Sequence, residues 1–302
     1  MANAPRKILC IDDDRMQHRL LQQLVKNFRT GPFECEAAES YDSGLKKLLS
    51  GKFAVCLLDY RLGRRDGLEI LHEARIAQCE TPIIFLTADD NEELDIAAME
   101  AGAVDYLVKS ELTPRLFERS VRYALKLGDT VRQLRQMALH DELTGLFNRR
   151  ELHRLLGEEW HRGSRFLHPF ALVLSDIDHF KRINDEHGHP VGDKVLCHVA
   201  SLLTGQVRLV DRLARFGGEE FAIIMPETGR QEAMSAIDRL RVLLEETPYI
   251  DPRTELTINV TISAGVAVSP HDATSPEDLI AAADKALYEA KKGGRNRVCS
   301  AG

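Results

Sequence analysis

Carboxylates and glycines gather in two segments of the C-terminal half of the chain. An apolar run over residues 170–174 leads into Ser175 and Asp176, and further along Gly217-Gly218 is followed at once by Glu219 and Glu220. Clustered carboxylates repel one another and need a cation, and their hard oxygen atoms suit Mg²⁺ or Mn²⁺. These residues predict a divalent-metal site of the kind that condensation of a nucleoside triphosphate requires.

A second set of polar residues lies in the N-terminal half, where each member follows a short apolar run. An aspartate can attack a phosphoryl group, and a lysine and a hydroxyl can hold the new phosphoryl oxygens. One polar residue after a strand is an ordinary loop residue, but polar residues at successive strand ends favour a phosphoryl-transfer site. The acids Asp12, Asp13 and Asp14 follow residues 8–11, Asp59 follows 54–58, Thr87 follows 83–86, and Lys109 follows 106–108.

We expect residues 6–125 to form an α/β domain whose strands and helices position these polar residues. Continuous apolar runs are typical of strands buried on both faces of a parallel sheet that helices cover. A weaker strand is expected near residues 33–37. In such sheets, sites form where the carboxyl ends of the strands meet, which is where the polar residues stand.

The whole chain of 302 residues is long enough for two domains. Its net charge of −7 argues against a protein that coats nucleic acid, although a few local cations suffice for a nucleotide ligand. We find no secretory signal and no apolar run long enough to insert in a membrane. The six scattered cysteines are expected to be free thiols, so we predict a cytoplasmic protein.

The N-terminal pattern resembles the receiver domain of bacterial response regulators, a flavodoxin-like, doubly wound fold. The resemblance implies that Asp59 accepts a phosphoryl group from a sensor histidine kinase. It also implies a metal site made by Asp12, Asp13, Asp59 and the carbonyl of Arg61, and a switch made by Thr87, Tyr106 and Lys109. The chain departs from the family at Ser110, where proline is usual, and at Gly63-Arg64-Arg65, where a proline-containing turn is commoner.

Residues 113–140 are expected to be a helical linker continuous with the last receiver helix. Thr113-Pro114 is typical of a helix start, and Gly128 is the one weak point in the helical pattern. Leucines, Tyr123 and Val131 recur at spacings close to a heptad. The segment is either an ordinary last helix with an amphipathic tail or a stalk that dimerises; we favour the stalk.

Residues 141–300 predict an α+β domain of the split βαβ type. Strands are expected over 170–175, 212–216, 221–225 and 257–269, in an antiparallel sheet with helices on one face. Gly217 and Gly218 predict a hairpin turn, since paired glycines allow positive φ. Ser275-Pro276 predicts the start of the last helix, and Gly293 its end.

Three segments of this domain together resemble the GGDEF family of diguanylate cyclases, which has a nucleotidyl-cyclase-like (ferredoxin-like) fold. They are residues 141–150, which match the family's DxLTGLxNRR segment, residues 170–181, and Arg215 to Phe221. The resemblance implies a catalytic centre of Asp176, Gly217, Gly218, Glu219 and Glu220. It further implies that Asp176, Glu219 and the carbonyl of Ile177 bind metal.

The nucleotide must be held without a P-loop, because no GxxxxGK[ST] segment is present. Lys291 and Arg295 can reach phosphates, as can the backbone around Phe180 and Lys181 at a helix start. The resemblance implies that Asn184 and Asp193 read guanine and that Arg215 contributes to GTP binding. We interpret Asp178 and Asp185 as framework or solvated residues.

The reaction implied by the family joins two GTP molecules into cyclic di-GMP and releases two pyrophosphates, which requires a homodimer with facing sites. The family also has an RxxD site for inhibition by product, which Arg208 and Asp211 match, with Arg239 as a second guanidinium from a neighbouring domain. Two other classes remain open. One is a silent domain that senses GTP or cyclic di-GMP, and the other is an interaction protein driven by phosphorylation.

Overall fold

The chain forms two units, which are described separately. The computed structural model describes residues 5–29, 31–88 and 91–302. Backbone contacts divide the chain into residues 1–135 and 136–302. The prediction that the N-terminus carries no secretory signal depends partly on residues 1–4, which lie outside the described residues.

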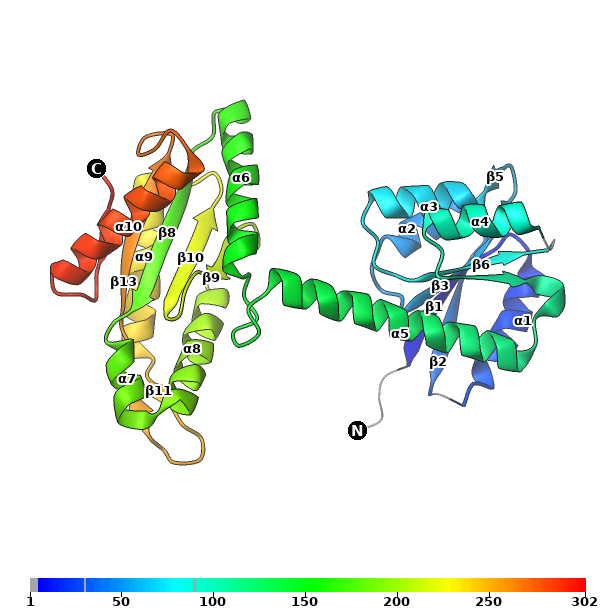
Figure 1. Cartoon of the computed structure of the whole chain (residues 1–302), viewed down its shortest axis with the longest axis horizontal. Coiled ribbons are helices and arrows are strands. Elements are labelled where there is room, and N and C mark those ends of the chain that lie inside the picture. The colour runs from blue at the N-terminus through cyan, green and yellow to red at the C-terminus, as the bar shows by residue number, and fades with distance from the viewer. Residues whose placement is uncertain (1–4, 30, 89–90) are drawn as a thin grey trace. The chain divides into compact units, whose positions relative to one another are not determined.

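A five-stranded parallel sheet forms the centre of the first unit, as predicted (Figure 1). Its order is β2-β1-β3-β6-β7, so that β1 and β3 lie side by side in the middle. The strands are β1 (Arg6–Ile11), β2 (Phe33–Ala38), β3 (Val55–Asp59), β6 (Ile83–Thr87) and β7 (Asp105–Val108), and a short hairpin adds β4 (Arg61–Leu62) and β5 (Arg65–Asp66).

Helices cover both faces of this sheet, because β3 and β6 are buried at every residue and neither face can be left to water. One apolar core holds side chains of α1 and α5, and the other holds side chains of α2, α3 and α4. The helices are α1 (Arg15–Lys26), α2 (Tyr41–Leu48), α3 (Gly67–Ile76), α4 (Glu92–Ala101) and α5 (Pro114–Leu139), with a 3₁₀ turn η1 (Lys109–Glu111).

The predicted helix from Pro114 is present as α5 and runs without interruption to Leu139. The Thr113 hydroxyl accepts a hydrogen bond from the Leu116 N–H at 3.2 Å, which caps its start. Gly128 does not weaken the helix locally. A Cβ there would lie 3.0 Å from Pro82, so the glycine lets the helix approach the body of the first unit. Residues 131–138 are exposed.

The second unit contains another five-stranded sheet, in the order β14-β13-β8-β10-β9. The predicted single strand over 257–269 is divided: β12 pairs with β11 in a separate ribbon, and β13 enters the main sheet. The edge strand β14 is parallel to β13, so the sheet is mixed. The strands are β8 (Phe170–Ile177), β9 (Arg212–Arg215), β10 (Glu220–Met225), β11 (Tyr249–Ile250), β12 (Thr257–Ile258), β13 (Ile262–Ser269) and β14 (Val298–Ser300).

The expectation of helices on one face of this sheet is wrong. The central strands β8 and β13 are buried at every residue, so both faces need cover. One core holds side chains of α7, α8 and α9, and the other holds side chains of α6 and α10. The helices are α6 (Arg149–Phe166), α7 (Phe180–His187), α8 (His189–Thr204), α9 (Arg230–Glu246) and α10 (Pro276–Lys292).

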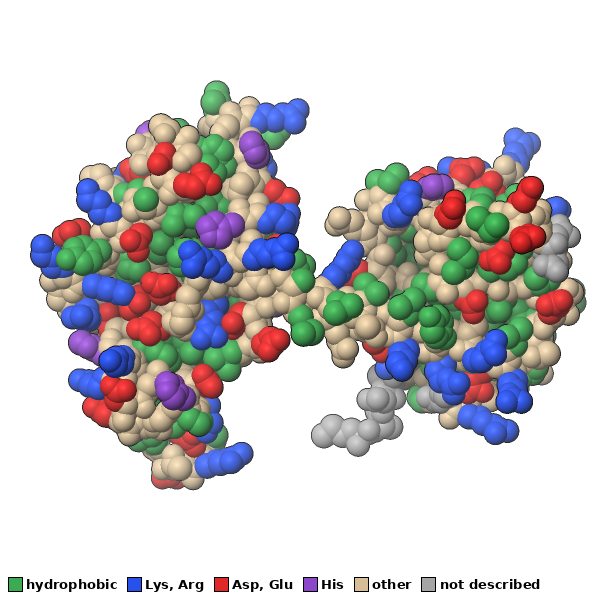
Figure 2. Space-filling model, in the orientation of Figure 1, with side chains coloured by type: hydrophobic (Ala, Val, Ile, Leu, Met, Phe, Trp, Pro, Cys, Tyr) green, Lys and Arg blue, Asp and Glu red, His purple; other side chains and the backbone are tan. Residues whose placement is uncertain are grey.

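The ends of α10 follow the predicted sequence signals. The Ser275 side chain accepts a hydrogen bond from the Asp278 N–H at 3.1 Å, and the helix ends at Gly293. Among the described residues, no helix combines the length and apolar character that a membrane span needs. On the face shown in Figure 2, basic and acidic side chains are interleaved over each unit.

Candidate functional site

The first candidate site is the group of acids at the carboxyl ends of β1 and β3. Asp12 and Asp13 follow β1, and Asp59 is the last residue of β3. Each of the three offers an oxygen, and these oxygens all lie within 4.8 Å of one another. Adjacent parallel strands bring these residues together, as predicted. Three converging carboxylates fit a hard divalent cation.

Lys109 is the cation that the chain itself places in this cluster. Its Nζ lies 2.8 Å from Oδ2 of Asp12 and 2.7 Å from Oδ1 of Asp59. Burial raises the pKa of the Asp59 carboxyl, and the bond to Lys109 opposes this. Burial acts to lower the pKa of Lys109, but its bonds to the two aspartates outweigh burial and raise it overall. The lysine therefore stays charged beside the acids.

The other predicted receiver residues surround this cluster. Thr87 ends β6 and is buried, while Tyr106 lies in β7 with its ring stacked on Phe85 at 6.4 Å between centroids. Arg61 lies in β4, two positions after Asp59 in the sequence. Thr87 and Lys109 therefore lie at the carboxyl ends of neighbouring strands, whereas Tyr106 lies within β7.

The two departures from the receiver pattern lie in ordered local structure. Ser110 lies in the 3₁₀ turn η1. Gly63, at φ 68°, joins β4 to β5, and its N–H donates to Oδ2 of Asp13 at 3.0 Å. The guanidinium of Arg65 lies 3.5 Å from the ring centre of Tyr41, which anchors the hairpin. The loop therefore touches the acid cluster without a proline.

The second candidate site lies where β8 and β10 pair. Glu220 stands opposite Asp176 in this antiparallel register, and the N–H of Ile177 donates to the carbonyl of Glu219 at 3.2 Å. Asp176 is buried, whereas Glu219 and Glu220 are half-buried at the turn from β9. Among the described residues, the receiver acids are the one group of three or more whose ligand oxygens all lie within 4.8 Å of one another. The acids of this second site are therefore spaced more widely.

Gly217 and Gly218 form the predicted hairpin turn, but for a reason other than positive φ. Neither glycine is among the described residues with positive φ, so that part of the expectation is wrong. A Cβ on Gly217 would collide with the carboxylate of Glu220, while one on Gly218 would meet open space. The first glycine therefore makes room for an acid of the site.

Electrostatic repulsion in this site is only partly relieved by the chain's own cations. Burial raises the pKa of Glu219, and the charge of Asp176 raises it further while Lys291 opposes it. Burial and Asp176 raise the pKa of Glu220 in the same way. Burial also raises the pKa of Asp176, although Lys291 Nζ lies 2.7 Å from its Oδ2. The excess of negative charge fits a divalent cation.

We therefore expect metal-free protein to be stabilised by Glu219→Gln. Because the pKa of Glu219 is raised in the folded protein, folding is more favourable when this carboxyl is neutral than when it is charged. This contribution to stability is complete below the ordinary pKa of 4.5 and is lost as the pH rises through the raised pKa. The melting temperature of Glu219→Gln should exceed that of wild type by roughly 1–2 °C at pH 7, because solvent screens an open site. The difference should vanish near pH 4.

Trp160 provides the measurement, since it is the only tryptophan and packs edge-on against Phe170 inside the second unit. Its fluorescence in the presence of a chelator reports the melting of that unit. Equal melting temperatures for the two proteins at pH 7 would contradict the repulsion argument.

The residues predicted to hold the nucleotide lie around this centre. Lys291 is in the last turn of α10, and Arg295 is in the loop after it, at φ 63°. Phe180 begins α7 with its side chain in the core, and Lys181 is exposed. The amide of Asn184 on α7 packs on Gly192 of α8, and this contact brings Asn184 next to the exposed Asp193.

Arg215 lies differently from the other predicted nucleotide ligands. Its Nη1 is 3.1 Å from both carboxylate oxygens of Asp141, and its Nη2 donates to the Gly218 carbonyl at 2.7 Å. The guanidinium thus ties the segment that opens the second unit to the glycine turn. No role for Asp141 was predicted, although this residue begins the DxLTGLxNRR segment.

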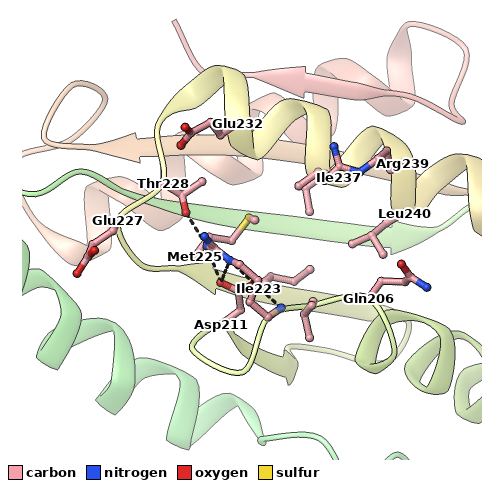
Figure 3. Close-up of a pocket in the computed structure, with 13 residues that line it drawn as sticks. Gln206, Asp211, Ile223, Met225, Glu227, Thr228, Glu232, Ile237, Arg239 and Leu240 are labelled. Atoms are coloured by element: carbon pink, nitrogen blue, oxygen red, sulfur yellow. Dashed lines mark hydrogen bonds and ion pairs between the residues drawn. The ribbon is translucent and has the colours of Figure 1, made fainter.

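A third candidate site is a cavity of about 350 Å³ that Arg208, Asp211 and Arg239 line together with apolar side chains (Figure 3). The N–H of Arg208 donates to Oδ2 of Asp211 at 2.8 Å, and Nη2 of Arg208 lies 2.8 Å from its Oδ1. The Thr228 hydroxyl accepts from the same Nη2 at 2.7 Å. Arg239, on α9 of the same chain, also lines this cavity.

Two family profiles match this chain. The profile described as "Diguanylate cyclase, GGDEF domain" matches residues 138–297, and "Response regulator receiver domain" matches residues 8–120. The fold and the sites thus define a response regulator with an enzyme-type output domain. The chain belongs to the GGDEF family and carries a receiver domain at its N-terminal side.

Individual relatives agree with this assignment. The chain is 31% identical to the response regulator PleD of Caulobacter vibrioides in an alignment that covers 97% of this chain and 65% of that protein. It is 42% identical to the diguanylate cyclase DgcP of Pseudomonas aeruginosa over 54% of this chain and 24% of DgcP. The chain therefore spans less than two thirds of these curated relatives.

A solved structure supports the fold of the second unit. The coiled coil and GGDEF domain of DgcB from Caulobacter crescentus, in complex with c-di-GMP, superposes with a TM-score of 0.57 at 31% identity. The match covers 62% of this chain and 97% of that one. The predicted nucleotidyl-cyclase-like fold is confirmed.

Proposed function

We propose that this protein is a phosphorylation-regulated diguanylate cyclase that condenses two GTP molecules into cyclic di-GMP and releases two pyrophosphates. The observation that carries the proposal is the placement of Asp176 on β8 beside the Gly217–Glu220 turn, with Lys291 2.7 Å from Asp176. Both GTP and a kinase donor are found in the cytoplasm, so the protein is proposed to act there.

In the proposed mechanism, Asp176, Glu219 and the Ile177 carbonyl hold Mg²⁺ or Mn²⁺, and Glu220 adds a further acid. Such an ion, when bound, lowers the pKa of the 3′-hydroxyl and neutralises phosphate charge. The remaining work of the protein is to position the reactants and to place charge where the phosphate becomes more negative. The turn glycines leave the approach to the acids open.

GTP is proposed to lie between the α7–α8 junction and the end of α10. Asn184 and Asp193 read guanine, because a carboxylate can accept from the adjacent N1–H and N2–H₂ donors that adenine lacks. Lys291 and Arg295 hold phosphates, together with the backbone at Phe180 and Lys181. The bonds of Arg215 to Asp141 and Gly218 support a role in shaping the turn beside its predicted contact to GTP.

Catalysis is proposed to need a C₂ dimer, because each cyclase domain holds one GTP and two must face each other. The exposed end of α5 supports a helical stalk that pairs with a second copy. Its outward side chains include Val131, Leu134 and Met137, which are 43%, 59% and 62% exposed. Pairing would raise the effective concentration of the partner site.

Phosphorylation of Asp59 by a sensor histidine kinase is proposed to favour the active dimer. The oxygens of the new phosphoryl group would form an ion pair with Lys109, which in this structure bridges Asp12 and Asp59. Thr87, at the end of β6, and Tyr106, on the neighbouring strand β7, would move toward it and change the surface of the receiver.

The test is an assay of purified protein with GTP and Mg²⁺, with and without beryllofluoride. Formation of cyclic di-GMP supports the proposed enzyme. GTP or cyclic di-GMP binding without turnover would identify a sensing module instead. Beryllofluoride-dependent dimerisation with no nucleotide binding would identify an interaction protein.

The cavity at Arg208 is proposed to bind cyclic di-GMP and to inhibit the enzyme. Replacing Arg208 by alanine should leave the initial rate within about twofold of wild type and weaken inhibition by added cyclic di-GMP by roughly tenfold or more, within the usual range of coupling between sites. A guanidinium can stack on guanine and donate to its acceptors, and alanine cannot.

Arg253→Ala, at an exposed position outside the cavity, is the matched control. Initial rates are measured at increasing cyclic di-GMP for the three proteins. Identical inhibition curves for wild type and Arg208→Ala would exclude this cavity as the feedback site.

A further inference from the structure

A second aspartate, Asp178, follows the strand that carries Asp176 and is only 6% exposed. Both of its carboxylate oxygens accept hydrogen bonds. Oδ1 accepts from the Ser263 hydroxyl at 2.6 Å, and Oδ2 accepts from the Thr261 hydroxyl at 2.8 Å and from the Asn296 N–H at 3.0 Å. A buried carboxylate with three donors is held in one position and holds its partners in turn.

The partner that matters for chemistry is Asn296, which lies in the loop after α10. Gly294, Arg295 and Asn296 have φ values of 113°, 63° and 44°, three left-handed residues in succession. Asparagine tolerates this conformation, but an arginine adopts it at a cost that other contacts must offset. The bond to Asp178 holds the last residue of this stretch.

Backbone bonds also hold the same loop. The N–H of Arg295 donates to the carbonyl of Ala290 at 3.1 Å, and the carbonyl of Arg297 accepts from Ala264 at 2.9 Å. The side chain of Asp178 ties the loop to the end of the strand bearing Asp176, and Nη1 of Arg241 on α9 donates to Oδ1 of Asn296 at 2.9 Å. The positions of the acids and of the loop cations are therefore coupled.

We propose that Asp178 is a positioning residue that fixes the loop over residues 293–297, so that Lys291 and Arg295 present their cations to the triphosphate. This inference rests on the proposed binding of GTP at this site. Lys291 is already 2.7 Å from Asp176, two residues before Asp178. Burial raises the pKa of the Asp176 carboxyl, and the charges of Lys291 and Arg295 oppose this rise. Asp178 itself has no contact with substrate in this scheme.

Two substitutions separate this role from a general loss of folding. Asp178→Asn is isosteric; its amide oxygen can accept from Asn296 and Thr261 while its NH₂ donates to Ser263. Asp178→Leu fills the space but accepts nothing. Trp160 fluorescence verifies that the second unit of each variant is folded, and Thr261→Val, which removes one of the three bonds, serves if Asp178→Leu is unfolded.

The first measurement needs no activity. Hydrogen–deuterium exchange of the segment 291–298 in nucleotide-free protein should be roughly tenfold faster in Asp178→Leu than in wild type. Asp178→Asn should exchange close to the wild-type rate. Exchange in β8 and β10 should be unchanged in both.

The second measurement is steady-state kinetics with GTP. Asp178→Leu should raise KM about tenfold and lower kcat by less than about threefold, and Asp178→Asn should restore the wild-type KM. If wild type itself makes no cyclic di-GMP, the proposed function has failed, and the dissociation constant for a non-hydrolysable GTP analogue is compared instead. Equal loop exchange in wild type and Asp178→Leu, or equal KM or affinity, overturns the inference.

Discussion

Glu219→Ala is expected to lower the rate of cyclic di-GMP formation by at least about a hundredfold while the fold persists. Removing a carboxylate that holds a divalent ion forfeits several kcal/mol of charge stabilisation in the transition state, where ~1.4 kcal/mol corresponds to a factor of ten. Asp176→Ala should have an effect at least as large, because Asp176 is buried between Glu220 and Lys291. The measurement is the rate of product formation from GTP at saturating Mg²⁺.

The fold of each variant is verified by the fluorescence of Trp160. Glu158→Ala provides a matched control, since this acid is exposed on α6 and pairs with Arg154 away from the turn. Its rate should equal that of wild type. Near-normal turnover by Glu219→Ala would contradict the assignment of Glu219 as a metal ligand.

Beryllofluoride is expected to raise the activity of wild type at least about fivefold and to increase its dimer fraction, and Asp59→Asn should show neither response. The fluoride complex mimics a phosphoryl group on Asp59, whose carboxylate now lies 2.7 Å from Lys109. Adding acceptor oxygens and charge at that point biases a two-state receiver by the ~1–3 kcal/mol typical of coupled sites.

Activity and sedimentation are measured on the same samples, at a protein concentration where wild type is partly dimeric. Asp129→Asn on α5 controls for the loss of one acid elsewhere in the receiver, because Asp129 is about half-exposed and pairs with Arg132. A response of Asp59→Asn equal to that of wild type would show that beryllofluoride acts elsewhere. Unchanged activity in wild type would refute receiver control.

Much of the fold was predictable because its signals are local. Continuous apolar runs marked the buried parallel strands β1, β3 and β6, and Thr113-Pro114 and Ser275-Pro276 marked two helix starts. The receiver acids were also predictable as a group. Strands of one parallel sheet end at a common edge, so residues that follow them must meet.

The errors in the second unit arose where distant segments decide the outcome. The division of residues 257–269 between a ribbon and the main sheet depends on pairing with β11 and β8. The cover on both faces comes from helices distant in the sequence, α7 to α9 on one side and α6 and α10 on the other, which bury β8 and β13 completely. Gly217 lies in the predicted turn without positive φ, and a Cβ there would displace the carboxylate of Glu220, a contact that only the tertiary structure shows.

The sequence by itself determined the two-domain order, the family and the residue types of each site, because these follow from short motifs and their spacing. Only the tertiary structure decided how the site residues are held. Asp178 reaches Asn296 across 118 positions of sequence, and Arg215 reaches Asp141 across 74. Hydrogen bonds of this kind form only after the sheet has brought strand and loop ends together, so no local pattern encodes them.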